Sequence, residues 1–425
     1  AGCGADGLRR GGASRYGAGV RVEALIPCDT TALAASPELP SALPPGRAAA
    51  LFDAGGVDAA AAIAPGAAWA PQPWAVRWGV PLTRFNRVEG LSSGIAARRV
   101  LGAGWAVDAT ARLGLADRVP NVELGVERAR PTHVGRLGAY TRLVGSDDYV
   151  APFTLGASLQ GAFDALDEAF YYRAHGAELT VTPGHSVAGG GVTARLFAEG
   201  QHGAAARART TLASLLGGGE RFADGIVDTL PVRAGWSVGA SLRWRPTWGS
   251  APLPEAWERW RVRGDLRLEA AGGSWGYGRA ALDLGGELAL PARWRLATTA
   301  SGGAHLGTLP VHRWWNLGGW QTVRGHRAGE RRGSTMWMVR SELAHGAGRA
   351  VVPYLFHDIG WAGTAGAPGG GATLQGAGAG LAALQGLVRL DVARALGPAA
   401  GAAGAPDGER RRPAWRVNLY VRARP

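Results

Sequence analysis

The chain has 425 residues, of which 68 are Gly and 17 are Trp, and 46% are hydrophobic, a composition that excludes intrinsic disorder. Two cysteines are too few for a disulfide scaffold. The longest weakly polar stretch, Val57–Ala70, is broken by Asp58 and Pro65, which excludes a membrane-spanning helix because such a helix needs about 20 apolar residues. The 46 basic residues are all Arg and give a net charge of +13, but they are scattered singly, which argues against nucleic acid as a partner.

Residues 1–83 differ from the rest of the chain, because they are rich in Ala and Pro and lack sustained periodicity. The pattern predicts a strand at Gly19–Ile26 and a short helix at Gly46–Phe52. Cys3 and Cys28 are compatible with a disulfide in an oxidising compartment. We interpret residues 1–83 as an N-terminal extension or the remnant of an upstream module.

From residue 84 onward, apolar and polar residues alternate with a period of two, which is the pattern of β-strands. In Trp236–Trp244, for example, Val238 and Leu242 share one face while Ser237 and Arg243 share the other. The same alternation predicts strands at Trp105–Leu113, Val122–Arg128, Arg259–Glu269, Arg279–Leu288 and Arg416–Arg422.

This alternation is typical of a transmembrane antiparallel β-barrel, with apolar residues outside and polar residues in the lumen. Trp at the ends of apolar faces suits an interfacial girdle, and charged faces of both signs let Arg oppose Asp and Glu across a lumen. We predict an all-β barrel of about 16 strands over residues 84–425. Loops are expected at Ser146–Ala169, Ala204–Thr229 and Thr364–Gly371, with a loop helix in Ala205–Leu216. A soluble β-sandwich or propeller is the alternative fold.

Few residues suggest catalysis. Gly184–Ala188 resembles a nucleophile elbow, but Ala188 stands where the motif needs Gly, so a polar hairpin turn is the better interpretation. The histidines are too dispersed to define a metal site, and a chain without Lys has no phosphate-binding loop of the GxxxxGK type. We therefore expect no catalytic residues, no metal and no cofactor, and no enzymatic activity.

One segment, Leu317–His326, combines a glycine pair with an Arg-Gly step at Arg324. The strand after it carries Glu342 on the face opposite its apolar residues, and the next strand carries Asp358. An Arg folded into a barrel needs partners, and a planar guanidinium can bridge two carboxylates. The pattern is compatible with a loop held in the lumen by Glu342 and Asp358, or with an exposed Arg-rich loop whose charges are solvated.

These motifs together resemble the bacterial surface antigen superfamily, which includes the outer-membrane barrel-assembly subunit and the two-partner-secretion transporters. The segments that carry the resemblance are Thr322–His326 (Thr-Val-Arg-Gly-His), Arg340–Leu343, Phe356–Gly360, Gly378–Leu381 and Val388–Ala393, with a weaker match at Arg84–Leu91. His326 departs from the family, which has Phe or Tyr there. The family usually carries POTRA repeats ahead of its barrel, and residues 1–83 do not have the pattern of one.

The resemblance implies an outer-membrane barrel with an inward-folded loop, which inserts or translocates proteins, or lipids, through a seam between its first and last strands. It implies a loop latch and supporting positions at Arg324, Gly325, Glu342, Asp358, Gly318, Gly319, Val323, His326, Gly360, Arg389 and Asp391. It also implies a monomeric barrel whose partners are outer-membrane lipid, lipopolysaccharide and a substrate polypeptide, with no nucleic acid. A passive pore or structural surface protein on the same fold, and a soluble β-rich domain, are the alternatives.

Overall fold

The computed structural model describes residues 8–16, 20–27, 71–130, 132–183, 191–218, 230–249, 260–346, 349–364, 371–396 and 415–421. The chain divides into two compact units, one of Ala1–Trp74 with Arg99–Val107 and one of Ala75–Arg98 with Asp108–Pro425. In the first unit, β1 and β2 form a two-stranded antiparallel sheet, and β2 contains most of the predicted strand at Gly19–Ile26. The predictions for Cys3, Cys28, Gly46–Phe52 and Gly184–Ala188 concern residues outside the described ranges.

The strands are β1 Leu8–Tyr16, β2 Val20–Pro27, β3 Ala75–Trp78, β4 Arg84–Asn86, β5 Gly90–Gly102, β6 Trp105–Gly114, β7 Pro120–Ala129, β8 His133–Gly145, β9 Tyr171–Pro183, β10 Val192–Gly203, β11 Gly235–Trp244, β12 Thr247–Gly249, β13 Trp260–Gly273, β14 Tyr277–Leu290, β15 Trp294–Gly307, β16 Trp315–Leu317, β17 Arg331–Gly333, β18 Thr335–His345, β19 Val351–Gly363, β20 Gly371–Ala383, β21 Val388–Leu396 and β22 Trp415–Val421. The helices are α5 Leu155–Asp164 and α6 Leu212–Leu215, with short 3-10 turns at Val80–Leu82, Pro291–Arg293, Val311–Arg313 and Leu384–Gly386.

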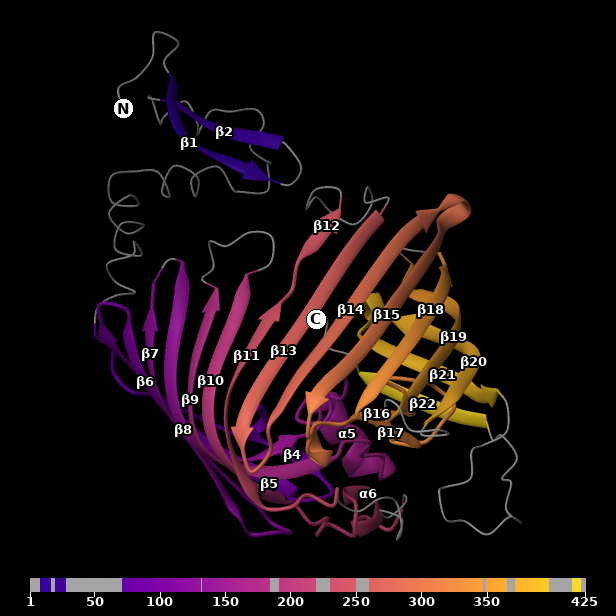
Figure 1. Cartoon of the computed structure of the whole chain (residues 1–425). Coiled ribbons are helices and arrows are strands. Elements are labelled where there is room, and N and C mark those ends of the chain that lie inside the picture. The colour runs from indigo at the N-terminus through magenta and orange to yellow at the C-terminus, as the bar shows by residue number, and fades with distance from the viewer. Residues whose placement is uncertain are drawn as a thin grey trace. The chain divides into compact units, whose positions relative to one another are not determined.

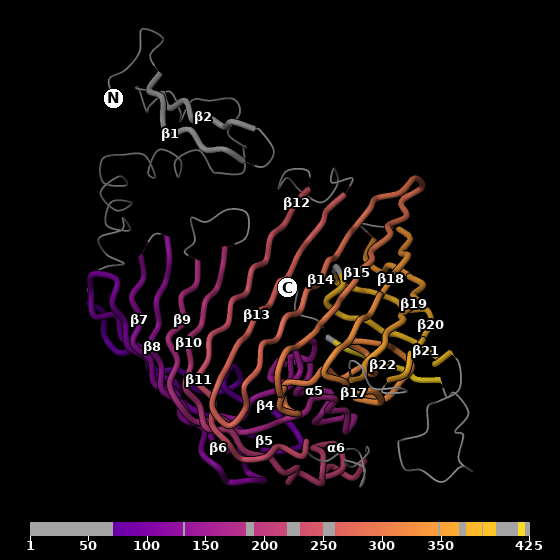
Figure 2. The backbone as a smooth tube through the Cα atoms, viewed as in Figure 1, coloured from indigo at the N-terminus to yellow at the C-terminus, as the bar shows by residue number. Residues whose placement is uncertain are grey.

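The second unit is a closed antiparallel barrel in which each strand pairs with its neighbours in chain order (Figures 1 and 2). Two strands are interrupted, because β3 and β4 both pair with β5, and β11 and β12 both pair with β13. With each interrupted strand counted once, the described residues form a ring of 16 strands that closes between β22 and β3. The predicted all-β antiparallel barrel is confirmed.

The two faces of the barrel differ in the way that the alternation predicts. Trp236, Val238 and Leu242 of β11 are exposed on the outer face, as are Leu282 and Leu284 of β14. A belt of exposed Trp and Leu is unfavourable in water but is stable in lipid. No helix in the described residues is long and apolar enough to cross a membrane.

The inner face carries ion pairs in addition to buried apolar residues. Arg142 lies 2.9 Å from Glu178, and Arg136 lies 2.8 Å from Asp108, in each case between side chains of different strands. In these pairs the opposite charge from another strand limits the cost of removing each charge from water.

The first strand of the ring is interrupted and includes residues before 84. Pairing with β5 starts at Ala75 rather than at residue 84. The segment Arg84–Leu91, expected to be one strand, contains a turn between β4 and β5. The Asn86 side chain makes this turn, since its Oδ1 accepts hydrogen bonds from the amides of Val88 at 3.0 Å and Glu89 at 2.8 Å. The division into an extension and a barrel at residues 83 and 84 stays a prediction.

The loop expected at Ser146–Ala169 lies between β8 and β9; we define the β8–β9 loop as Ser146–Phe170, and it contains α5. Thr154 caps the helix, because its Oγ1 accepts a hydrogen bond from the Ala157 amide at 3.2 Å. The helix inside the loop was not predicted, because strand periodicity does not detect a single short helix between two strands.

The helix predicted over Ala205–Leu216 is also wrong in extent, because only Leu212–Leu215 is helical. The amides of Arg207 and Ala208 donate instead to the carbonyl of Arg87, at 3.0 and 2.9 Å. Contacts with the first turn of the barrel thus override the helix propensity of an Ala-rich segment.

Candidate functional site

The segment that combines the glycine pair with Arg-Gly forms an inward-folded loop between β16 and β17. We call Gly318–Glu330 the clamped loop. Its two flanking strands pair with each other from Trp315 opposite Gly333 to Leu317 opposite Arg331. Trp315, Leu317 and Val323 are fully buried and pack with Met336, Met338 and Leu374 of the barrel wall. The apolar residues of this hairpin thus cover the inner face of β18 to β20.

Arg324 of the clamped loop is fully buried and is held mainly by Asp358 of β19. Its Nε and Nη2 donate to the two carboxylate oxygens of Asp358 at 2.6 and 2.8 Å, and its backbone amide donates to Oδ2 at 3.1 Å. Side chain and main chain of one residue therefore bind the same carboxylate. This fork geometry is specific to Arg, since Lys is a point charge without a planar donor pair.

The remaining nitrogen of the guanidinium, Nη1, reaches two further strands. It donates to Glu342 of β18 at 2.8 Å and to Asp391 of β21 at 3.3 Å, and the guanidinium lies 3.6 Å from the ring centre of Phe356. Burial lowers the pKa of Arg324, but the hydrogen bonds and charge of Asp358 outweigh this effect and raise the pKa above its ordinary value. The loop is therefore anchored as a cation in a pocket of carboxylates.

Arg389 of β21 adds a second positive charge that partly balances the carboxylates around Arg324. Its Nη2 donates to Glu342 at 2.8 Å, and its Nε donates to the hydroxyl of Tyr354 at 3.0 Å. The Tyr354 hydroxyl in turn donates a short hydrogen bond to Asp391, which also accepts one from Tyr420 of β22 at 2.9 Å. The side chains of the cluster thus come from four wall strands, β18 and β19 on one side of β20 and β21 and β22 on the other.

β20 takes part through its main chain, because Gly376 lets the clamped loop approach closely. A Cβ atom at Gly376 would lie 1.8 Å from the carbonyl oxygen of Arg324, and one at Gly325 would lie 2.6 Å from the amide nitrogen of Ala395. Gly325 also has a φ of +89°. Neither position can accommodate a side chain unless the loop moves.

The other predicted glycines shape the loop and its seat. Gly318 and Gly319 have φ of +104° and +88°, and the Gly319 amide donates to the carbonyl of His326 at 3.0 Å, which closes the loop. On β19, a Cβ at Gly360 would lie 3.1 Å from Leu317 Cδ1, so this glycine makes room for the hairpin.

His326 stands where the resembled family has Phe or Tyr. Its side chain is buried and makes two polar contacts. Its Nδ1 lies 3.0 Å from Glu330 Oε1 and its Nε2 lies 2.8 Å from the carbonyl oxygen of Gln375. The imidazole therefore ties the loop to its own end and to β20. With His at this position the loop stays packed against the wall.

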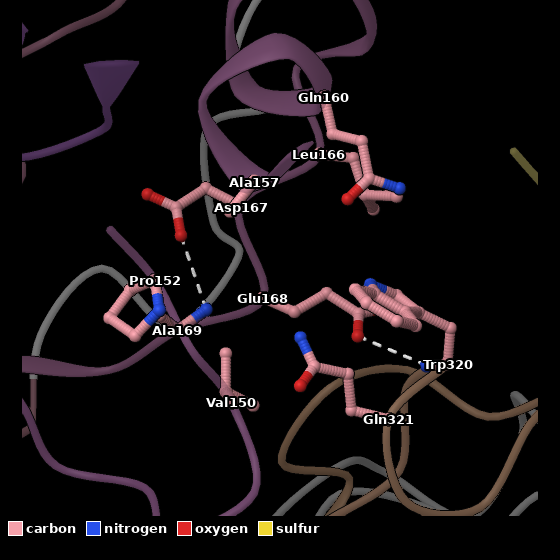
Figure 3. A pocket seen from close by; sticks show the side chains of 10 residues that line it. All are labelled: Val150, Pro152, Ala157, Gln160, Leu166, Asp167, Glu168, Ala169, Trp320 and Gln321. Carbon is pink, nitrogen blue, oxygen red and sulfur yellow. Dashed lines mark hydrogen bonds between the residues drawn. The ribbon is translucent and has the colours of Figure 1, made fainter. Parts of the chain in front are cut away.

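The opposite side of the clamped loop is covered by the β8–β9 loop (Figure 3). Glu168 Oε2 accepts a hydrogen bond from the Trp320 amide at 3.1 Å, and a Cβ at Gly319 would lie 2.2 Å from the same oxygen. Burial raises the pKa of Glu168 to about 8, and the negative charges of Asp167 and Asp147 raise it further. The hydrogen bond from the Trp320 amide and the positive charge of Arg416 lower this pKa but offset the rise only in part.

The structure thus brings together Arg324, Glu342, Asp358, Arg389 and Asp391, all of which were singled out in the sequence. It adds residues that were not singled out, namely Tyr354, Gly376, Glu168, Trp320 and Tyr420. Tyr354 and Tyr420 could have been found, because each shares the inward face of its strand with a predicted residue or neighbours one. Glu168 gave no signal, since its position depends on how a long loop folds.

Comparisons with known proteins agree with this geometry. The family described as haemolysin secretion/activation protein ShlB/FhaC/HecB matches residues 279–383, which run from β14 to the end of β20 and include the clamped loop. No curated protein sequence matches the chain. The family match confirms the predicted resemblance over this part of the chain.

Solved structures with a similar fold include BamA from Haemophilus ducreyi lacking POTRA domains 1–3, at 12% identity and a TM-score of 0.52, covering 82% of this chain and 70% of that one. CdiB from Acinetobacter baumannii (14% identity, TM-score 0.40) and CdiB from Escherichia coli (13%, 0.44) are matched over 80% and 82% of this chain. This chain spans 58% and 62% of the length of those two CdiB chains. The similarity to BamA establishes the barrel fold.

Proposed function

We propose that the chain is a bacterial outer-membrane barrel that secretes polypeptides or inserts them into the membrane. The observation that carries the proposal is the cluster around Arg324, which lies inside the segment matched by the secretion/activation family. A passive pore needs no fully buried cation on a loop that folds against its inner wall, and burial of such a cation is costly unless carboxylates pair with it. The action proposed is non-enzymatic: the clamped loop sets the width and stability of the path.

The surroundings of the barrel are part of the same proposal. The belt of exposed Trp and Leu would contact outer-membrane lipid and lipopolysaccharide, and one chain would suffice to form the pore. Connections at one end of the barrel are short, such as Pro291–Arg293 and Leu384–Gly386, whereas the β8–β9 loop and the clamped loop lie together at the other end. Since outer-membrane barrels have short periplasmic turns, we assign the clamped loop to the extracellular end.

Planar lipid bilayers test the proposal. An unfolded, uncharged polypeptide added on the side of the short turns should interrupt the ionic current through the barrel in discrete events. Arg324→Ala should change the frequency of these events at least tenfold, while Arg327→Ala, which alters an exposed Arg of the same loop, should leave it unchanged. A steady open current with no polypeptide-dependent interruption would favour a passive pore and refute the proposal.

A further inference from the structure

Helix α5 reaches both strands at which the barrel closes. The Gln160 side-chain amide donates to the main-chain carbonyl of Leu419 in β22 at 2.8 Å. The next residue, Gly161, packs on β4, and a Cβ at this position would lie 3.3 Å from Cδ1 of the buried Phe85. Two consecutive residues of one helix therefore contact the last strand and the first interrupted strand of the ring.

The same loop also binds β16, which precedes the clamped loop, and Trp320 of the clamped loop itself. Before α5, Asp148 accepts hydrogen bonds from Trp315 Nε1 at 3.2 Å and from Arg279 Nη2 at 2.6 Å. After α5, Glu168 accepts the amide of Trp320, whose indole stacks on Tyr420 of β22 with ring centres 4.3 Å apart. The β8–β9 loop is thus joined to the clamped loop, to the first strand and to the last strand.

We propose that the β8–β9 loop is a releasable pin across the closing seam, with Gln160, Gly161 and Glu168 as its positioning residues. The inference rests on the proposed function, because a pin matters only if the seam or the clamped loop moves during polypeptide transfer. On the first-strand side the loop is held by cations, since the ring centre of Phe153 lies 4.0 Å from the Arg84 guanidinium and the carbonyl of Ala169 accepts a hydrogen bond from Arg87. On the β22 side its hydrogen bond is the neutral one from Gln160, whereas Arg324 makes four side-chain hydrogen bonds to carboxylates.

This difference in strength assigns different tasks to the two elements. Loss of a single neutral hydrogen bond typically changes an equilibrium only about fivefold, while hydrogen bonds to charged groups contribute roughly twice as much free energy each. The pin can therefore be released by a passing polypeptide while the charged cluster stays intact. The seam would open first, with the clamped loop still docked on β18 to β21.

Hydrogen exchange on the whole barrel in lipid nanodiscs tests the pin without reference to transport. Gln160→Leu removes the donor, and we expect amides of β22 to exchange about fivefold faster while those of residues 322–326 in the clamped loop are unchanged. Leu159→Ala, on the exposed face of the same helix, is the matched control. Unchanged exchange in β22 for Gln160→Leu would overturn the proposal, and heat-modifiable gel migration verifies that each variant forms a barrel.

A cleavable cross-link between the β8–β9 loop and the barrel tests whether this loop must be released during polypeptide transfer. Cysteines are introduced at Gln160 and at Asn418, which neighbours the Leu419 carbonyl that Gln160 contacts, in a chain with Cys3→Ser and Cys28→Ser, and are joined by a cleavable bis-maleimide so that the loop is fixed to β22. We expect current interruptions by the unfolded polypeptide to fall at least tenfold in the joined barrel and to return after cleavage. Normal interruptions in the joined barrel would refute the pin, whereas their absence in the wild-type barrel would refute the proposed function and leave the exchange result standing.

Discussion

Replacement of Arg324 by Ala tests whether the buried cation holds the clamped loop. The substitution removes four side-chain hydrogen bonds and leaves Asp358 and Asp391, both fully buried, without their main cation. Removal of one partner of a buried ion pair typically costs about 3–5 kcal/mol. The loop should therefore undock far more often, although the barrel itself should still form.

Two neighbouring cations reduce this cost. Arg340 Nε lies 3.6 Å from Asp358 Oδ1, and Arg389 already binds Glu342. Both side chains can therefore shift toward the carboxylates that lose Arg324. We therefore expect the lower end of the range, about 3 kcal/mol. At about 1.4 kcal/mol per factor of ten, the undocked population should rise on the order of 100-fold.

Hydrogen exchange at the Arg324 amide measures this change directly, because that amide donates to Asp358 in the docked loop. Exchange at residue 324 should accelerate about 100-fold in the Ala variant, and by less in Arg324→Lys, which keeps the charge but loses the fork. Arg327→Ala serves as the control in the same loop. An acceleration below threefold in Arg324→Ala would show that the charged cluster does not hold the loop, and the reasoning would be wrong.

Three further substitutions test individual contacts. Gly376→Ala places a Cβ 1.8 Å from the Arg324 carbonyl oxygen, so it should undock the loop as strongly as Arg324→Ala does, whereas Gly302→Ala, with open space at its Cβ, should not; proteolysis of the loop compares the two. Glu342→Gln keeps the size of the side chain but weakens charged hydrogen bonds to two Arg residues, so exchange at residue 324 should rise by about tenfold. The pKa of Glu168 is raised from 4.5 to about 8, so its contribution to docking of the clamped loop is fully present below pH 4.5 and is lost as the pH rises through 8. Glu168→Gln should abolish this pH dependence in hydrogen-exchange rates that are corrected for the intrinsic effect of pH. A pH dependence that persists in this variant would assign it to another group.

Much of the barrel could be predicted because its strands obey a period of two over many residues. Asp358 and Glu342 were assigned to the lumen since each lies on the face opposite exposed residues such as Trp337 and Leu355, and the structure has the same alternation. Arg324 could be singled out because a buried Arg needs carboxylates and two were available on the strands that follow. Local periodicity was therefore sufficient to place these inward side chains.

The β8–β9 loop could not be predicted by the same reasoning. Glu168 and Gln160 gain their roles only after the chain has closed a ring, which brings residues near 160 against residues near 419. Likewise, Asn86 makes a turn where a strand was expected, because one side chain accepts two amides. Contacts of this kind depend on individual hydrogen bonds and on tertiary placement, and sequence periodicity carries no information on either.

The two elements that bind the clamped loop differ in a way that bears on how such a barrel can be both stable and able to open. The cluster around Arg324 joins strands that are already neighbours in the sheet, so its strength adds rigidity to one wall and does not oppose opening at the seam. The seam between β22 and β3 is bridged instead by Gln160 and Gly161 of α5, through contacts that are weak one by one. If the strong charged contacts lay across the seam, release would cost several kcal/mol for each contact broken. Because they lie on the wall, opening of the seam would break none of them.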